Sequence, residues 1–514
     1  MWESAALSVT VFLPLVGAAA IALIPHAKER SAKPVALAVT LATFALSLLI
    51  LASYYLGPAG GQGRAFIVDV EWIPVIGAGY RVAIDGISMP LFVLTNLLTL
   101  LCVVYCFHHI EPPGRPRAFL GLILLLQTGM AGTFVAFDLI LFFVFWELVL
   151  VPMYFLIGIW GGPHREYAAV KFFLYTMFGS MIMLVGFIAL YFGAGAETFS
   201  MVELSQAAAG GEYGIVFQRL VFLAIFLGLA IKVPMWPFHT WLPDAHTEAP
   251  TVGSVLLAGI MLKMGTYGFV RIAVPMLPEA AVDYAPFLAV LAVIAILYGA
   301  LCCMAQTDLK RLIAFSSVGH MGFVMLGIAA LTTAGVNAAI FGMVAHGLIT
   351  GMLFFVVGSL KHRYHTSTIA DIGGGVLQTT PRIGAILTFV AIASLGLPPL
   401  PGFWGEVVAL YAAFNPAEAI VDAGLLGLFR VLVVFGAIGT LLTAGYFLTM
   451  LQRVTMGTPP RRWVDAGLQD VSPIELGAWT PLLVTTVVVG LVPLLVFGIT
   501  RPDVSRILTT ALTG

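Results

Sequence analysis

Charged residues are scarce in this sequence. Asp, Glu, Lys and Arg together make up 10% of the 514 residues, whereas 60% are apolar. Apolar runs long enough to cross about 30 Å of hydrocarbon recur from one end of the chain to the other. The composition therefore indicates a helical protein that crosses the membrane many times. With a net charge of −1 and no basic run, the sequence gives no reason to expect a nucleic-acid partner.

Cysteine is also rare, with four residues in the whole chain. Cys102, Cys106, Cys302 and Cys303 all lie in apolar runs, and no two of them form the Cys-x-x-Cys spacing typical of metal sites and disulfide frameworks. We expect buried, unreactive thiols and no metal site.

Hydropathy predicts an all-α fold with about 14 transmembrane helices. The expected spans are 5–24, 33–56, 84–108, 116–137, 138–160, 166–194, 214–242, 249–276, 283–304, 308–330, 332–360, 381–415, 424–452 and 477–500. They group into N-terminal helices 1–3 (1–115), a first repeat of helices 4–8 (116–276), a second repeat of helices 9–13 (283–452) and C-terminal helix 14 (453–514).

The loops on alternate sides of these spans differ in basic residues. Lys and Arg are more frequent in the loops reached after the first span, such as Lys28 and Arg30, than in the loops on the other side, to which Arg64 and Arg271 are assigned. Basic loops stay in the cytoplasm. The sequence therefore predicts a multi-pass protein of the bacterial inner membrane with both termini on the outer, periplasmic side.

A small set of ionisable residues lies too deep in these spans to reach water. Helical rise places most of them about 14 to 21 Å from the start of their spans. They are Glu147, Lys232, Lys263, His320, His346 and Glu406, each on a different expected span. Charged side chains at this depth cost about 2.5–3.5 kcal/mol on insertion scales and usually mark ion pathways.

Structural explanations exist for each residue taken singly. The acids and lysines could form ion pairs that lock helices together, and a single buried histidine is often a hydrogen-bonded core residue. As a set, however, two acids, two lysines and two histidines at similar depth favour a proton pathway. Burial disfavours a charged lysine and a nearby carboxylate restores it, so that a changing Glu147–Lys232 separation could drive a proton onward. The histidines suit relay sites and Glu406 suits the outlet.

Two proline-rich segments interrupt expected helices next to these charges. Pro234 and Pro237 follow Lys232, and the run Leu397–Gly402 (LPPLPG) precedes Glu406. Paired broken helices beside buried charges are typical of transporters built from inverted repeats, which predicts two inverted five-helix repeats. Alternatively, the prolines only kink helices for packing.

The residues around Lys232 and Lys263 carry a family resemblance. The run Lys232–Thr251 (KVPMWPFHTWLPDAHTEAPT), followed by Leu256–Gly268 (LLAGIMLKMGTYG), closely resembles the antiporter-like membrane subunits of respiratory complex I, NADH-quinone oxidoreductase. Similarity extends over nearly the whole chain, and Asp308–Gly322 resembles the family's tenth span. Glu406, where two of the three subunit types usually carry lysine, favours the M type, the counterpart of mitochondrial subunit 4. The extra prolines of Leu397–Gly402 depart from the family's usual form.

The resemblance implies a role for each residue. Glu147 and Lys232 match the family's driving pair, Lys263 its central relay, His320 and His346 the bridge, and Glu406 the outlet. It also implies that this chain binds no redox cofactor and no metal, with FMN, iron–sulfur clusters and quinone in other subunits. The expected partners are protons, lipid and the neighbouring antiporter-like subunits of the membrane arm.

Other polar residues have weaker assignments. His239, Asp244 and His246, together with Asp308 and Lys310, could support proton uptake, although Asp244 and His246 could equally cap a helix end. Residues Lys361–His365 suggest a solvated loop or a subunit contact. Two other functions stay open: a subunit of a multi-subunit sodium–proton antiporter, and a haem protein in which His320 and His346 ligate iron.

Overall fold

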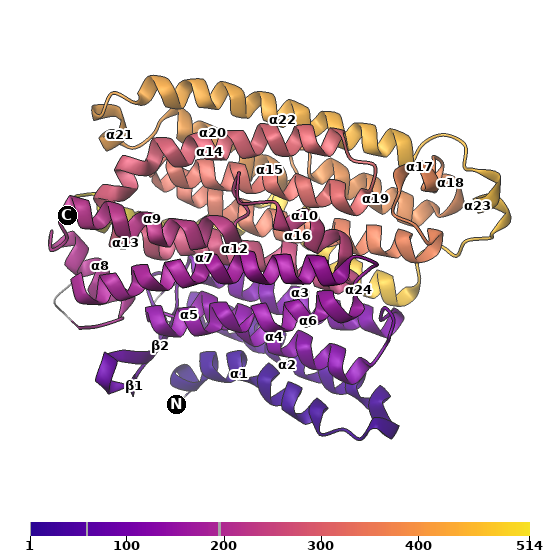
Figure 1. Ribbon diagram of the computed structural model, residues 1–514, viewed down its shortest axis with the longest axis horizontal. Coiled ribbons are helices and arrows are strands. Elements are labelled where there is room, and N and C mark those ends of the chain that lie inside the picture. The colour runs from indigo at the N-terminus through magenta and orange to yellow at the C-terminus, as the bar shows by residue number, and fades with distance from the viewer. Residues whose placement is uncertain (1, 58–59, 194–196, 514) are drawn as a thin grey trace.

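Long apolar helices lying side by side make up most of the fold (Figure 1). A computed structural model of the chain describes residues 2–57, 60–193 and 197–513. The helices that cross the bundle in one piece are α1 (Trp2–Ala22), α2 (Ala32–Leu56), α3 (Ser88–His108), α4 (Pro116–Val135), α7 (Arg165–Gly193), α14 (Pro278–Met304), α15 (Leu309–Ala329), α16 (Thr333–Tyr364), α22 (Leu426–Val454) and α24 (Pro473–Leu491).

Other crossings consist of consecutive shorter segments. These are α5 (Leu139–Leu148) with α6 (Leu150–Trp160); α9 (Ile215–Lys232) with α10 (Trp241–Glu248); α11 (Thr251–Leu256), η3 (Leu257–Met261), α12 (Leu262–Gly268), η4 (Phe269–Ala273) and α13 (Val274–Met276); and α19 (Pro381–Ala393) with α20 (Pro401–Phe414). Both η3 and η4 are π-helical turns. Such turns often occur at functional sites because they shift side chains and free a carbonyl group.

The remaining elements lie at the ends of the bundle. They are η1 (His26–Ser31), the antiparallel hairpin of β1 (Ala65–Ile73) and β2 (Ala78–Ile84) with η2 (Pro74–Ile76) between its strands, α8 (Met201–Ala209), α17 (Ile369–Ile372), α18 (Val376–Thr379), α21 (Glu418–Asp422), α23 (Arg461–Asp465) and α25 (Leu494–Thr513). The hairpin turns at Gly77, whose φ of 63° suits a residue without a side chain.

The all-α, multi-span fold expected from the sequence is confirmed. Within the described residues, 13 helical segments are long and apolar enough to cross a membrane, and the expected span 381–415 is divided between α19 and α20. The expected limits of span 477–500 are wrong, because α24 ends at Leu491 and a separate helix, α25, starts at Leu494. Pro493 cannot donate a backbone hydrogen bond, which explains the break. The β1–β2 hairpin was not expected either.

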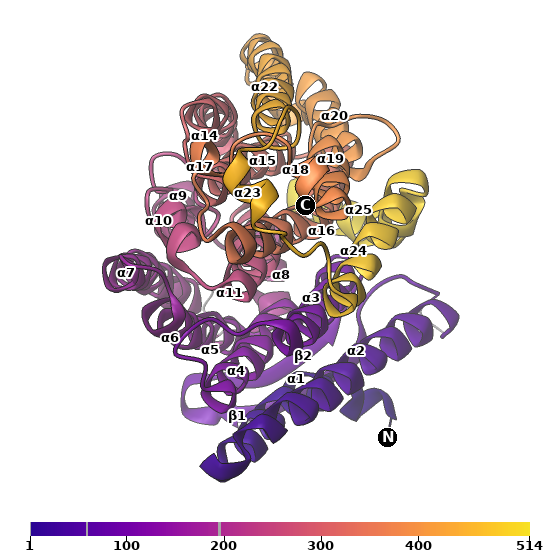
Figure 2. The ribbon, with the colours of Figure 1, turned by 90° about the vertical axis from the view of Figure 1, so that its right-hand side faces the viewer.

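Both ends of the chain lie at one end of the bundle, on the left of Figure 1. We call this the terminal end and the other the opposite end. The shared position agrees with an even number of crossings. Viewed from the opposite end (Figure 2), α1 and α2 lie at one edge of the bundle, α22 lies at the other, and α16 runs near the centre. In the most apolar 18-residue window of α16, 94% of the residues are buried.

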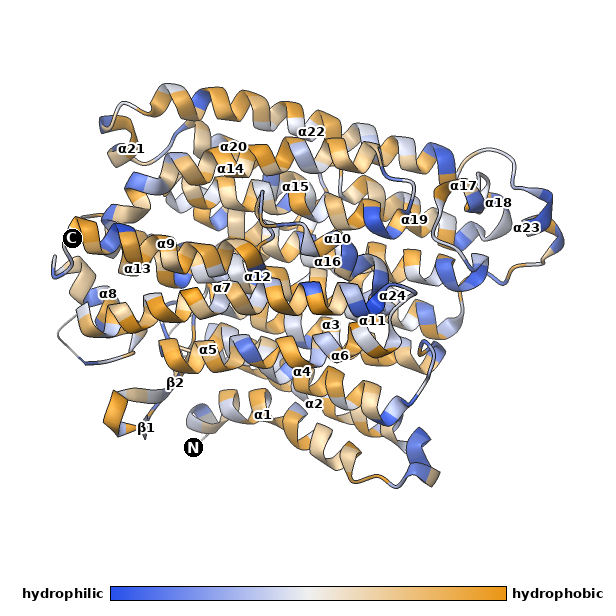
Figure 3. Ribbon diagram, viewed as in Figure 1, coloured by the Kyte–Doolittle hydropathy of each residue, from blue (hydrophilic) through white to orange (hydrophobic). Residues whose placement is uncertain are grey.

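Apolar residues cover the middle of the bundle, and hydrophilic residues gather towards its ends, above all at the opposite end (Figure 3). Many exposed apolar side chains lie on α2, α7 and α22, for example Leu49, Phe178 and Leu441. Helix faces of this kind can be covered by lipid or by another apolar protein surface.

Two helix starts, α5 and α15, are built alike at different ends of the bundle. Asp138 caps α5, and the amide of Leu139 donates to the carbonyl of Phe199. Asp308 caps α15, and the amide of Leu309 donates to the carbonyl of Ser367. The first arrangement lies at the terminal end and the second at the opposite end (Figure 1).

Candidate functional site

The six deep ionisable residues lie on six different helical segments. Glu147 is in α5, Lys232 is the last residue of α9, Lys263 is in α12, and His320, His346 and Glu406 are in α15, α16 and α20. Lys232 and Lys263 are 1% and 0% exposed, and His346 and Glu406 are also buried. Glu147 and His320 are partly buried. The depth inferred from the sequence therefore corresponds to real burial.

Four of these side chains form a connected row. The Nζ atom of Lys263 lies 2.6 Å from His346 Nδ1. The rings of His346 and His320 meet edge to face with their centroids 5.7 Å apart. His320 Nδ1 lies 3.1 Å from Glu406 Oε1. The row thus joins α12, α16, α15 and α20 across the bundle.

The π-helical turn η3 helps to hold the Lys263 side chain. It ends two residues before Lys263, and the Nζ atom also donates to the carbonyl of Ala258 inside that turn. In a regular α-helix that carbonyl would accept a backbone amide. The turn therefore supplies an oxygen that holds the buried ammonium while its other partner, His346, lies across the helix interface.

The other end of the row lies beside the break between α19 and α20. Ser394, the residue directly after α19, lies with its Oγ 2.9 Å from His320 Nε2. Glu406 contacts the opposite nitrogen of the same ring. A cavity of about 30 Å³ lies between His320, His346, Ser394 and Glu406. A volume of about 10–15 Å³ is enough for one water molecule.

Glu147 and Lys232 form a looser couple. Each is close enough to affect the charge of the other. Among the residues that the structure describes, however, neither Lys232 Nζ nor Glu147 Oε1 has a hydrogen-bond partner. The ammonium lies 5.1 Å from the centre of the Trp146 ring instead. A cation over an aromatic face is stabilised, but less than in a direct ion pair. Among the described residues, Glu147 and Lys232 therefore form no direct ion pair, and Ser180 interacts with the Glu147 carboxylate instead.

A break separates this couple from the connected row. No hydrogen bond in the described part of the chain links Lys232 to Lys263. The two helices are nevertheless in close contact, because a Cβ at Gly265 would lie 2.9 Å from the carbonyl oxygen of Leu229 and 2.7 Å from Val233 Cγ2.

Two of the supporting residues have mainly structural contacts. Asp244 accepts a hydrogen bond from Lys171 Nζ at 2.7 Å, and Arg311 lies 3.6 Å from its second oxygen. It therefore pairs α10 with α7 and does not cap a neighbouring helix. Asp308 caps α15 through the amide of Arg311 and accepts a hydrogen bond from Ser367 Oγ.

The supporting histidines are buried without polar partners. Within the described residues, both ring nitrogens of His246 are unpaired, and its ring stacks on Phe354 with centroids 4.5 Å apart and planes 13° apart. His239 packs against Tyr298, with its Nδ1 likewise unpaired. Unpaired imidazoles in a buried position are costly, so these rings deserve a functional explanation.

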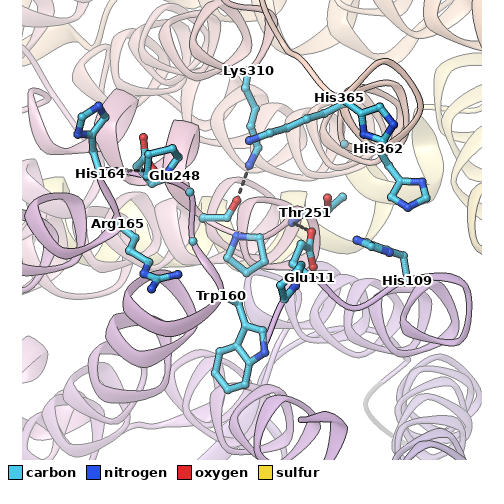
Figure 4. Close-up of a pocket in the computed structure, with 18 of the residues that line it drawn as sticks. His109, Glu111, Trp160, His164, Arg165, Glu248, Thr251, Lys310, His362 and His365 are labelled. Atoms are coloured by element: carbon cyan, nitrogen blue, oxygen red, sulfur yellow. Dashed lines mark hydrogen bonds between the residues drawn. The ribbon is translucent and has the colours of Figure 1, made fainter. Parts of the chain in front are cut away.

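A large polar cavity opens at the opposite end of the bundle (Figure 4). Its volume is about 890 Å³. The side chain of Lys310 points into it and donates to the carbonyl of Ala249. The cavity wall also carries His109, Glu111, His164, Arg165, Glu248, Lys361, His362 and His365. We call this cavity the vestibule. Burial and neighbouring Lys33 and His108 lower the pKa of His109 in its rim, although Glu111 opposes the change.

The expectation of a solvated loop at Lys361–His365 is wrong for Arg363. Helix α16 extends to Tyr364, and Arg363 forms a buried ion pair with Glu475 at 2.6 Å. Sequence reasoning did not pair these residues because they are 112 positions apart. It also assigned Arg271 to a loop, whereas Arg271 is buried within η4 and paired with Asp85.

The geometry of His320 and His346 does not fit a haem. Both nitrogens of His320 already contact Glu406 and Ser394, and Nδ1 of His346 contacts Lys263. The cavity beside both rings holds about 30 Å³, far less than a macrocycle needs. The same contacts suit a chain of proton donors and acceptors.

Comparisons with known proteins agree with this arrangement. Residues 136–427 match the family described as NADH:quinone oxidoreductase/Mrp antiporter, TM. The chain is 40% identical over 516 residues to NADH-quinone oxidoreductase subunit M of Rhodobacter capsulatus, covering 98% of this chain and 96% of that protein.

Two solved structures are similar throughout. A chain of respiratory complex I from Thermus thermophilus is 27% identical with a TM-score of 0.85, covering 98% of this chain and 99% of the other. A chain of the Mrp complex from Dietzia sp. is 21% identical with a TM-score of 0.83, covering 99% of this chain and 98% of the other, a likeness of fold alone.

Proposed function

The chain belongs to the NADH:quinone oxidoreductase/Mrp antiporter transmembrane family, and from that membership we propose that its buried ionisable row carries protons. It is a multi-pass subunit of the membrane arm of NADH-quinone oxidoreductase, an enzyme complex that translocates protons. Its neighbours are other antiporter-like membrane subunits. FMN, iron–sulfur clusters and quinone belong to other subunits, and the redox chemistry there drives this one.

The connected row Lys263–His346–His320–Glu406 carries the proposal. Lys263 donates its proton to His346 Nδ1 at 2.6 Å and becomes a neutral amine. The doubly protonated ring of His346 then releases the proton on its Nε2 side toward His320. One water in the adjoining cavity would bridge the rings, which do not bond directly at a centroid separation of 5.7 Å. His320 passes the proton to the carboxylate of Glu406 at 3.1 Å.

The Glu147–Lys232 couple controls when a proton is released toward Lys263. Two unit charges 4 Å apart interact by about 4 kcal/mol at an effective dielectric constant of about 20. Bringing Glu147 up to Lys232 would therefore hold a proton on the lysine, and withdrawing it would release that proton toward Lys263. Lys232 Nζ has no hydrogen-bond partner among the described residues, whereas Glu147 interacts with the Ser180 hydroxyl and would exchange that contact for Lys232.

The vestibule suits proton uptake from the opposite end. Lys310 connects it to the interior, and the charges of Lys310 and Lys263 both act on His246. The unpaired ring of His246 could therefore rotate between the two lysines. Asp244 and Asp308 would hold the surrounding helices rather than transfer protons, since both are engaged in ion-pair and capping contacts. His239, whose Nδ1 is unpaired among the described residues, stays a candidate for proton uptake.

We also propose that 116–276 and 283–452 are inverted halves of one repeat, flanked by 1–115 and 453–514. The matching starts of α5 and α15 at different ends of the bundle support this relation. The proposed location is the bacterial inner membrane, with the terminal end outside and the vestibule in the cytoplasm, because the basic loops lie on the vestibule side.

The direct test is Lys232→Ala or Glu147→Ala in the complete complex. We expect assembly at normal levels and loss of the protons that this subunit translocates per NADH oxidised in sealed vesicles. Lys28→Ala removes an exposed lysine outside the row and should leave the ratio unchanged. A normal ratio in both test variants would refute the role of the couple, and dependence of transport on sodium would favour sodium–proton exchange.

A further inference from the structure

A buried ion pair closes the terminal end of the helix that carries Lys263. The Nη2 atom of Arg271 lies 2.6 Å from Asp85 Oδ1 and 2.7 Å from Asp85 Oδ2. Both side chains are at most 5% exposed. Arg271 lies in the π-helical turn η4, two helical turns or about 12 Å beyond Lys263. The pair therefore sits between Lys263 and the terminal end.

Several groups hold this pair in place. Asp85 Oδ1 also accepts from the amides of Ile87 and Ser88, at 3.1 and 3.0 Å. Arg271 Nε donates to the Tyr267 hydroxyl at 3.1 Å, and that hydroxyl donates to the carbonyl of Phe134. These contacts tie together the start of α3, the end of α4 and the helix of Lys263. Nothing in the proposed proton row requires such a junction.

A water-sized route from the terminal end stops at the same pair. A cavity of about 300 Å³ opens there, and Arg64, Asp85, Phe137, Arg271 and Arg506 are among its lining residues. On the Lys263 side of the pair, Lys263 and Tyr267 are each 0% exposed. The ion pair thus forms the boundary between an open cavity and the dry interior.

The charges at this boundary oppose the passage of a proton. Three guanidinium groups line the cavity, and the ring of Phe137 lies 4.7 Å from the central carbon of the Arg271 guanidinium. Burial raises the pKa of Asp85, but Arg271 and Ser88 outweigh it, so that the pKa lies below its usual value and the carboxylate stays ionised. A fixed arginine excludes protons electrostatically from other membrane pores.

We propose that the Asp85–Arg271 pair is a proton seal, which prevents protons on Lys263 from escaping at the terminal end and commits them to Glu406. The inference depends on the proposed proton row. It gives Arg271 and Asp85 a positioning and barrier role in the first half of the chain, where the sequence showed only a loop arginine.

The test measures passive proton conductance of sealed vesicles that contain the whole complex, with an imposed potential and no NADH. Arg271→Gln should raise conductance about tenfold, the effect of removing one charge about 12 Å from the pathway at an effective dielectric constant of about 20. Arg271→Lys keeps the positive charge and should leave conductance unchanged. Asp85→Asn leaves a more positive site and should not raise conductance. Adding Lys263→Ala to Arg271→Gln should abolish the leak.

Normal conductance in an assembled Arg271→Gln complex would overturn the seal. If that variant fails to assemble because Asp85 is left unpaired, the double variant Asp85→Asn/Arg271→Gln avoids a lone carboxylate. It differs from Asp85→Asn by one positive charge and should conduct about tenfold more than that single variant. Failure of the proton row itself gives a different result, since Lys263→Ala alone would then pump normally.

A second measurement needs no change to the pair. An impermeant thiol reagent applied from the side of the terminal end should label Ser205→Cys, which lines the open cavity, and not Thr266→Cys, which lies behind the seal. Ser205→Cys also identifies which face of the vesicle is the terminal end. Labelling of Thr266→Cys from that side in an otherwise unchanged chain would contradict the proposal.

Discussion

Glu406→Gln tests the outlet of the row with little change in shape. Glu406 is 4% exposed, and its Oε1 lies 3.1 Å from His320 Nδ1. Glutamine keeps an acceptor oxygen at that position but can neither carry a negative charge nor take a proton. The variant should therefore fold and assemble while the last transfer fails.

The magnitude follows from the hydrogen bond that is lost. A hydrogen bond to a charged group contributes about 1.5–3 kcal/mol and a neutral one about 0.5–1.5 kcal/mol. The difference is about 1–1.5 kcal/mol. The population of protonated His320 therefore falls about tenfold. Because the glutamine also cannot accept that proton, we expect coupled proton transfer to fall by at least about tenfold.

The assay records NADH oxidation and vesicle acidification together in membranes containing the whole complex. Glu418→Gln is the matched control, because Glu418 is an exposed carboxylate in α21, outside the row. It should behave as the unaltered complex. Unchanged turnover and an unchanged proton ratio in Glu406→Gln would show that protons leave elsewhere and would refute the reasoning.

Three further outcomes follow from the same geometry. His346→Ala should slow proton transfer less than Lys263→Ala, because the cavity beside His346 can admit water in place of the ring, and the reverse order of rates would contradict the row. Gly265→Ala should destabilise the complex by about 1–3 kcal/mol in thermal unfolding and slow pumping, since its Cβ would meet the Leu229 carbonyl at 2.9 Å, whereas Gly477→Ala meets nothing and should do neither. The Asp85–Arg271 pair should keep its stabilising contribution as pH falls from about 8 to about 5, because the lowered pKa keeps Asp85 ionised; the contribution is lost only as pH falls through that lowered pKa. The difference in thermal unfolding between the unaltered complex and Asp85→Asn should therefore be constant over this range, and a difference that shrinks across it would show that the pair breaks earlier.

The residues of the row could be found from the sequence because charges in apolar segments are so few. Counting helical positions gave the depth of Lys232 and Lys263, and the proline runs placed helix ends close to Lys232 and Glu406: α9 ends at Lys232, and α20 starts at Pro401. Depth and local chain breaks are properties of neighbouring residues, which a sequence records directly.

Partners across the bundle could not be found in this way. Asp85 and Arg271 are 186 positions apart, and nothing in the local sequence of either residue indicates the other. The contact of Ser394 with His320 depends likewise on how far α19 rotates before it ends. Helical periodicity gives the height of a side chain but not the neighbour that its face meets, which tertiary packing decides.

Two parts of the proposed proton path differ in how closely their residues are connected. From Lys263 through His346 and His320 to Glu406, neighbouring side chains are already in contact or within one water of each other, so little motion is needed for transfer. Before Lys263, Lys232 has no hydrogen-bond partner among the described residues, although α9 and α12 are in close contact. Proton transfer from Lys232 to Lys263 therefore needs a rearrangement that brings a proton acceptor within hydrogen-bond reach. In the proposed mechanism, the junction between α9 and α12 is therefore the step at which the energy of the redox reaction is used, and the row beyond it is a pre-formed path.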